Sequence, residues 1–143
     1  MNGNAASERN DSRHGRDERP TPAAIHFQKH VPMVGTFSVR PLQMPDDMPL
    51  VHGWVTREHA KFWGMQNKSV QEVEAGYREI LMPPRSKAFI GLHDAKPVFL
   101  LECYHPAEDP IGKYYDVRPG DRGMHILVAP ADRPLPTFTW HVF

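Results

Sequence analysis

Four short stretches of the chain have the apolar and polar pattern of β-strands. Residues 36–40 alternate apolar and polar side chains before Pro41, and this period of two predicts a strand. Residues 87–92 and 98–104 predict two more strands, joined by a polar loop at 93–96 that is short enough for a hairpin. A fourth strand is expected over residues 124–129.

Two segments between the first and second of these strands have helical spacing. After Asp46 or Asp47, either of which can cap a helix, apolar residues fall on one stripe, and Gly64 is the expected stop. The second helix begins with a capping box at Ser69–Glu72, continues with apolar positions at helical spacing and ends at Pro83-Pro84. The residues from 137 onward look like the first turns of a third helix.

The length of 143 residues allows one domain. Residues up to about 24 mix opposite charges with Asn, Ser, Gly and Pro and carry almost nothing to bury, so we expect a disordered tail over residues 1–35. The folded domain is expected over residues 36–143, with an α/β order of strand, helix, helix, three strands and an incipient helix.

Composition excludes several classes of function. Lysine plus arginine and aspartate plus glutamate both number 17, so no basic excess is available to hold a nucleic acid. The longest aliphatic and aromatic run, residues 98–101, is far shorter than the ~20 residues of a membrane span. One cysteine allows no internal disulfide, and together with the lack of an apolar leader this favours a cytoplasmic protein.

His125 is the polar residue that most needs an explanation. It opens the fourth predicted strand and shares a face with Leu127 and Ala129, which by itself favours a hydrogen-bonded core histidine. A histidine is also the side chain best suited to accept a proton near neutral pH. The strand pattern leaves both interpretations open.

Three stretches together resemble the GNAT superfamily of N-acetyltransferases, in the branch that acylates lysine or N-hydroxylysine side chains in siderophore assembly, as in the aerobactin and mycobactin pathways. The resemblance covers about residues 37–143. The stretches are Phe62-Trp63-Gly64-Met65-Gln66, then Glu102-Cys103-Tyr104 followed by Asp109-Pro110-Ile111-Gly112, and, as the most specific, Tyr114-Tyr115-Asp116 with Gly120 to His125.

The resemblance implies a GNAT-like mixed sheet flanked by helices, which this chain carries only as far as the fourth strand and the start of the third helix. It also implies transfer of an acyl group from acetyl-CoA or another acyl-CoA to a small amine or hydroxylamine, with other siderophore-pathway enzymes as possible partners. His125 matches the family's catalytic histidine. The aspartate that works with that histidine on the next strand has no counterpart among these residues.

The remaining site residues are expected from the same resemblance. Backbone amides on the fourth strand would stabilise the oxyanion, and the loop and helix start after it would hold the coenzyme phosphates. This loop contains no glycine and several prolines, a departure from the family pattern. The expected coenzyme residues are Leu127, Val128, Ala129, Arg133 and Thr137, and the expected acceptor-pocket residues are Trp63, Gln66, Tyr104, Tyr115 and Asp116.

Other functions compete with this hypothesis. Cys103, His105 and His93 can approach one another across the predicted hairpin, but their spacing is not that of a zinc site, so we expect no metal. Apolar strand neighbours suggest a buried Cys103 with a raised thiol pKa, which argues against a cysteine nucleophile. The main alternative is an inactive fragment or interaction remnant of an acyltransferase.

Overall fold

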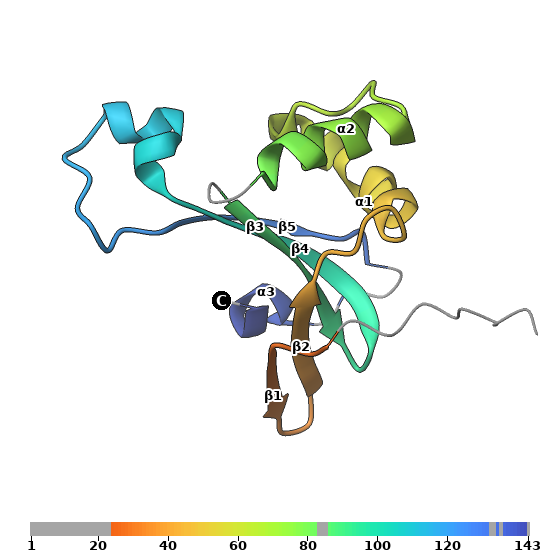
Figure 1. Ribbon diagram of the computed structural model, residues 1–143. Coiled ribbons are helices and arrows are strands. Elements are labelled where there is room, and N and C mark those ends of the chain that lie inside the picture. The colour runs from red at the N-terminus through yellow and green to blue at the C-terminus, as the bar shows by residue number, and fades with distance from the viewer. Residues whose placement is uncertain (1–23, 83–85, 132–133, 135, 143) are drawn as a thin grey trace, which may run out of the picture.

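The computed structural model describes residues 24–82, 86–131, 134 and 136–142. The strands among them form one antiparallel sheet in the order β1-β2-β3-β4-β5. Figure 1 shows α1 and α2 together over one face of this twisted sheet and α3 on the other side. The strands are β1 (Phe27–Val31), β2 (Gly35–Pro41), β3 (Ser86–His93), β4 (Lys96–Tyr104) and β5 (Gly123–Val128).

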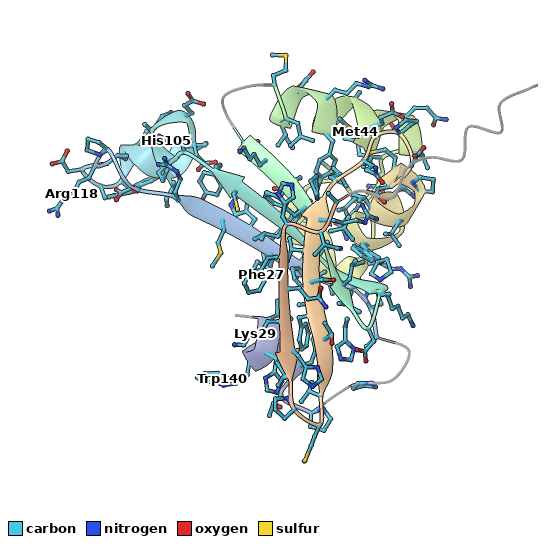
Figure 2. The ribbon with its side chains drawn as sticks, turned by 60° about the horizontal axis from the view of Figure 1, so that its bottom comes forward. Phe27, Lys29, Met44, His105, Arg118 and Trp140 are labelled. Atoms are coloured by element: carbon cyan, nitrogen blue, oxygen red, sulfur yellow. The ribbon has the colours of Figure 1, made fainter. Side chains whose placement is uncertain are left out.

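The predicted strands are confirmed with ends shifted by one or two residues. β3 and β4 form the expected hairpin, and its turn residues Asp94 and Ala95 both have positive φ, as a tight hairpin turn requires. β4 and β5 are joined by a long loop that contains two short helical turns, η2 (Pro106–Glu108) and η3 (Pro110–Lys113). Figure 2 shows His105 at the start of this loop and Arg118 at its outer tip, away from the sheet.

β1 lies inside the segment that we expected to be a tail. It pairs antiparallel with β2, with Phe27 opposite Val39, so ordered structure begins before residue 36. Four of its five residues are exposed, and the strand is held by its backbone pairing with β2 and not by a buried face. That is why no apolar pattern indicated it. The earlier part of the expected tail, residues 1–23, lies outside the described residues.

The helices differ in one respect from the prediction. The first is two elements, α1 (Met48–Val55) and the 3₁₀ helix η1 (Glu58–Trp63), because the chain leaves helical geometry after Thr56. Gly64 ends η1 with a φ of 72°, as expected. α2 (Val70–Ile80) has the full capping box, in which Ser69 Oγ accepts the Glu72 N–H and the Glu72 carboxylate accepts the Ser69 N–H. The prolines expected to end it, Pro83 and Pro84, lie outside the described residues.

The main core lies between these helices and the sheet. α1 and α2 contribute the apolar sides that the sequence pattern predicts, and β3, β4 and β5 contribute alternate residues of one face. The buried residues of this cluster are Met48, Val51, Trp54, Val55, Ala60, Val73, Tyr77, Ala88, Ile90, Leu92, Leu100 and Leu127. α3 (Phe138–Val142) packs on the opposite face, where Phe138 contacts the rings of Phe37 and His93.

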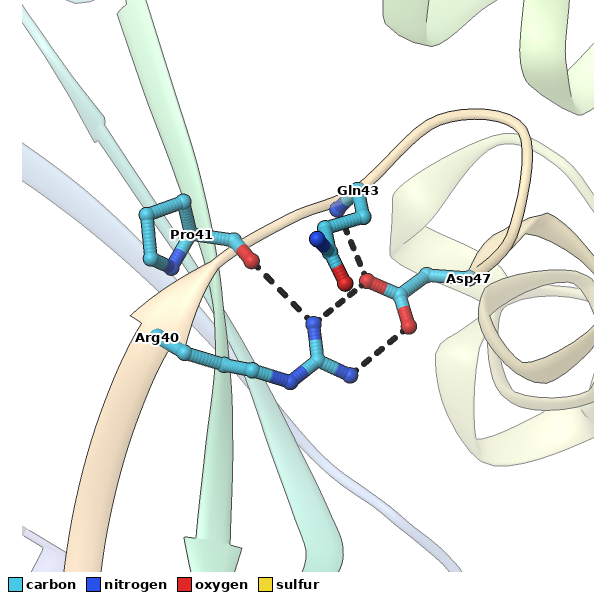
Figure 3. A network of polar contacts seen from close by, with 4 residues as sticks. All are labelled: Arg40, Pro41, Gln43 and Asp47. Carbon is cyan, nitrogen blue, oxygen red and sulfur yellow. Dashed lines mark hydrogen bonds and ion pairs between the residues drawn. The ribbon is translucent and has the colours of Figure 1, made fainter. Parts of the chain in front are cut away.

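A largely buried ion pair ties β2 to the start of α1. Arg40 donates from its two terminal nitrogens to Asp47, at 2.7 and 2.8 Å, and also to the carbonyl of Pro41 (Figure 3). Asp47 is the N-cap residue of α1, but its carboxylate accepts from Arg40 and from the Gln43 N–H and makes no capping bond. The bidentate geometry fixes the direction in which the chain enters α1.

Candidate active site

Polar and aromatic side chains from four elements meet on the helix-covered face of the sheet, at the ends of β4 and β5 that lead into their long connecting loop. His125 comes from β5, Glu102 and Tyr104 from β4, Tyr77 from α2 and Trp63 from η1. Alternation along each strand places these strand residues on the same side as the core residues Leu100 and Leu127. The group therefore lies where the core opens to solvent.

His125 lies at this opening. It is directly opposite Glu102 in the β4–β5 register, and its Nδ1 lies 3.5 Å from Oε2 of Glu102. Its side chain is 49% exposed, whereas that of Glu102 is only 9% exposed. The His125 side chain is thus half exposed and has a buried carboxylate beside its Nδ1.

Tyr77 is hydrogen-bonded to the second oxygen of the Glu102 carboxylate. The Tyr77 hydroxyl donates to Oε1 of Glu102 at 2.6 Å and accepts from the indole N–H of Trp63 at 3.2 Å. Burial, and then the negative charge of Glu102, raise the pKa of Tyr77 far above its usual value. The hydroxyl is therefore a permanent donor to Glu102.

Two aromatic rings flank His125. The Tyr104 ring lies 4.7 Å from the His125 ring, centroid to centroid, and the Trp63 ring lies edge-on at 6.0 Å. Tyr104 fits there because its cross-strand partner is Gly123, where a Cβ would stand 2.2 Å from the Tyr104 ring. The glycine that precedes the histidine in the sequence motif thus makes room for this ring.

A pocket of about 360 Å³ opens beside His125. It is bounded by the end of α2, by β3 and β4, and by the loop with η2 and η3. Its wall is acidic, with carboxylates from different elements and two histidines. The lining residues that matter here are Glu79, Glu102, Tyr104, Glu108, Asp109 and His125.

The expected acceptor residues are only partly brought together. Tyr104 lines this pocket and Trp63 contacts His125. Gln66 instead donates to Glu58 at 3.1 Å and borders a separate hollow beside Lys68. Tyr115 and Asp116 are exposed on the β4–β5 loop. Partial loss of hydration, then the nearby Asp121 and Tyr104, raise the pKa of Tyr115.

The expected coenzyme residues differ in what their amides can do. The Ala129 N–H donates to the Val98 carbonyl at 2.9 Å, so this amide is already engaged. Because N–H directions alternate along an antiparallel strand, the Leu127 amide also faces β4 and the Val128 amide faces the outer edge of β5. Within the described residues no strand pairs with that edge, so of these three amides only that of Val128 is directed away from β4.

The residues expected to hold the coenzyme phosphates follow β5. Thr137 immediately precedes α3, and its carbonyl accepts the His141 N–H at 3.3 Å. Arg133 lies outside the described residues.

The competing sites receive no structural support. In the described part of the chain, no three His, Cys, Asp or Glu side chains are grouped as metal ligands would be. Cys103 is half-buried, and burial raises its thiol pKa, as predicted. No helix among the described residues is both long and apolar enough to cross a membrane.

Sequence reasoning missed the pairing of Glu102 with His125 and the role of Tyr77. The alternation of β4 showed that Glu102 and Tyr104 share a face, but the register across a long loop was unknown. Tyr77 looked like an ordinary apolar position of α2. Its hydroxyl, on the helix stripe that faces the sheet, was the one available signal.

Comparison with known families supports the resemblance. Residues 43–143 match the family model described as an acetyltransferase (GNAT) domain. The N(6)-hydroxylysine O-acetyltransferase of Escherichia coli is 31% identical over 111 residues, which are 76% of this chain and 35% of that protein. The N-hydroxyputrescine acetyltransferase of Acinetobacter baumannii is 27% identical over 107 residues, 75% of this chain and 51% of that protein. The chain therefore spans about a third to a half of these relatives.

Solved structures show the same fold. An uncharacterized protein from Bacillus halodurans superposes with a TM-score of 0.67 at 26% identity, over 76% of this chain and 55% of its own. The aminoglycoside acetyltransferase AAC(6′)-Ib, solved with paromomycin and acetyl-CoA, superposes with a TM-score of 0.57 at 21% identity, over 68% of this chain and 56% of its own. The α/β fold expected from the sequence is confirmed, and the described part of its sheet is antiparallel throughout.

Proposed function

We propose, from the premise that this chain belongs to the GNAT acetyltransferase family, that the protein is a cytoplasmic acyl-CoA-dependent N-acyltransferase of siderophore biosynthesis. Its acceptor would be the side-chain nitrogen of lysine or N6-hydroxylysine. The observation that carries the proposal is the pairing of a solvent-accessible His125 with a buried Glu102 at the mouth of a pocket. The printed names of two relatives, which act on hydroxylated amines, support the acceptor class.

The residues provide what acyl transfer requires. The acceptor nitrogen attacks the thioester carbonyl carbon, so that an N–C bond forms, the C–S bond breaks and coenzyme A leaves as its thiol after taking up a proton. Nε2 of His125 would orient the acceptor nitrogen and receive its proton. A hydroxylamine nitrogen is less basic than an amine, so with that acceptor His125 would mainly orient. The Val128 N–H, at the open edge of β5, would stabilise the oxyanion.

The pocket chemistry fits the ammonium group of the acceptor. Carboxylates of Glu79, Glu108 and Asp109 line the pocket beside His125, and a wall of one sign concentrates ligands of opposite charge. A lysine-like acceptor carries an α-ammonium group next to its α-carboxylate, and an N-hydroxylated diamine carries an ammonium group alone, in both cases away from the reacting nitrogen. The pocket volume of about 360 Å³ lies within the ~300–1,000 Å³ of typical small-molecule sites.

The test is an acylation assay on the complete protein as its gene encodes it. Acetyl-CoA is supplied with N6-hydroxylysine, lysine or an N-hydroxylated diamine, and release of the coenzyme A thiol is followed with a thiol-reactive dye. Release that depends on one of these acceptors is expected. No release with any of them would refute the proposed acceptor class.

A matched pair of histidine variants tests the site. His125→Ala is expected to lower kcat by at least about 100-fold, the contribution of a positioned acid–base group. His59→Ala, at an exposed residue of η1 outside the pocket, is expected to leave kcat unchanged. Normal turnover by His125→Ala would identify His125 as a structural histidine.

A further inference from the structure

Glu102 is a buried carboxylate that the reaction as described does not use directly. It lies on β4 opposite His125, and only 9% of its side chain is exposed. A charged group in such surroundings is unfavourable unless it is paired and hydrogen-bonded. The partners of its two carboxylate oxygens therefore indicate the role of Glu102 in the site.

One oxygen is fixed by a chain of donors that begins at the partly buried Trp63 and passes through the core at Tyr77. The Trp63 indole can only donate, so the Tyr77 oxygen accepts from it at 3.2 Å and the Tyr77 hydroxyl proton points to Oε1 of Glu102 at 2.6 Å. Tyr77 is fully buried and belongs to the main core cluster. This chain holds the carboxylate in one orientation.

The other oxygen, Oε2, faces Nδ1 of His125 at 3.5 Å. An ionised carboxylate can only accept, so it favours the neutral imidazole tautomer with its proton on Nδ1. In that tautomer Nε2 carries the free lone pair, and His125 is one of the residues that line the pocket. The distance is long for a hydrogen bond, as is common for catalytic contacts before substrate binds.

We propose that Glu102 is a positioning residue for His125 and that Tyr77 and Trp63 hold Glu102 in place. Glu102 sets the tautomer and orientation of the ring so that Nε2 meets the acceptor nitrogen. The proposal rests on the proposed acyl transfer for its catalytic consequence, but the tautomer does not depend on any activity. It assigns to a residue within this chain the carboxylate role that the family resemblance placed on a later strand.

A purely structural role for the Tyr77–Glu102 pair predicts a different outcome. In that case Glu102 would only satisfy the Tyr77 hydroxyl, and changing it would alter stability without affecting the His125 tautomer. Glu102→Gln separates the two roles. The glutamine oxygen can still accept from Tyr77, but its amide then presents a donor to Nδ1 and favours the opposite tautomer of His125.

The deciding measurement is nitrogen-15 NMR of the histidine rings in the complete protein, with the imidazole neutral and the His125 signals identified by their loss in His125→Asn. We expect a protonated Nδ1 in the unaltered protein and a protonated Nε2 in Glu102→Gln. The proposal is overturned if the unaltered protein has its proton on Nε2, or if Glu102→Gln keeps the original tautomer. If Glu102→Gln does not fold, the tautomer of the unaltered protein alone decides.

Kinetics provide a second readout. We expect Glu102→Gln to lower kcat about 100-fold with little change in KM for acyl-CoA, and Tyr77→Phe to lower kcat less, because the carboxylate remains. Glu74→Gln, on α2 where Glu74 pairs with Arg78, is the matched control and should leave kcat unchanged. An unaltered kcat in Glu102→Gln would refute the positioning role, whereas an inactive parent protein would refute the proposed function and leave the NMR result to decide this inference.

Discussion

Gly123 provides a sharp test of the site because the reason for glycine at this position is space. Its backbone is not in the left-handed region, yet a Cβ built on it would lie 2.2 Å from Cζ and 2.4 Å from Cε2 of Tyr104. Ordinary contact begins at 3.4 Å, so Gly123→Ala must push the tip of the Tyr104 ring by about 1.2 Å. That ring packs 4.7 Å from the His125 ring, so the displacement reaches the proposed catalytic group.

The expected effect on activity is larger than the effect on folding. A misplacement of about 1 Å near reacting groups can reduce the rate as much as about 100-fold, so we expect kcat/KM of Gly123→Ala to fall by about 10- to 100-fold. The moving atoms are the end of a half-buried side chain, so the loss in free energy of unfolding should stay near 1–2 kcal/mol, at the low end for overpacking.

The assay for Gly123→Ala is thiol release with acetyl-CoA and the best acceptor, beside urea unfolding of the same samples. Gly120→Ala is the matched control, because no atom lies within 4 Å of a Cβ at that position, and it should match the parent protein in both measurements. If Gly123→Ala kept the parent kcat/KM, the packing of Tyr104 against His125 would have no part in the reaction. If Gly120→Ala lost as much activity, the effect would belong to the loop and not to the ring.

Three further outcomes follow from individual contacts. The raised pKa of Tyr77 contributes stability that is complete below the tyrosine's usual pKa of ~10 and is lost as pH rises above it. The decline in unfolding free energy above pH ~10 should therefore be shallower in Tyr77→Phe, by up to ~1.4 kcal/mol per pH unit. An identical slope in the two proteins would contradict this. Arg40→Met leaves the buried Asp47 carboxylate without its ion pair and should lower the unfolding free energy by about 3 kcal/mol. Arg78→Met, at an exposed pair, should change it by less than ~0.5 kcal/mol. Equal losses would show that the Arg40 pair contributes no more to stability than the exposed pair does. Raising ionic strength from ~0.01 to ~1 M should raise KM for a cationic acceptor several-fold through screening of the pocket carboxylates, and a constant KM would show that they do not attract it.

Local signals account for what the sequence could predict. The capping box at Ser69 and Glu72, the polar turn of the β3–β4 hairpin and the stop at Gly64 are each encoded within a few residues, so they could be recognised without knowledge of the fold. β1 has no such signal, because its five residues pair through their backbone with β2 and bury almost nothing. Strands of this kind can be recognised only in the folded structure, where the strand that they pair with is known.

The candidate site was predicted only in part for a similar reason. The motif before His125 indicated the residue, and the strand period placed it on the face of Leu127. Its partner depends on the register of β4 against β5 across a long loop, and a shift of one residue would have put Glu102 on the other face. The donor that fixes Glu102 comes from Tyr77 on α2, which sequence spacing alone cannot align with a strand.

The contact between core and site explains how a half-exposed histidine can hold a defined orientation. His125 has 49% of its side chain exposed, and an exposed imidazole on a sheet edge would ordinarily sample several rotamers. Here its partner is a buried carboxylate, which is bound to a hydroxyl in the middle of the main core. A group supported on strands and a helix is held more accurately than one on loops. The α2 helix therefore does more than cover the sheet: because Tyr77 both fills the core and donates to Glu102, a change that loosens the packing of α2 should also loosen the orientation of His125.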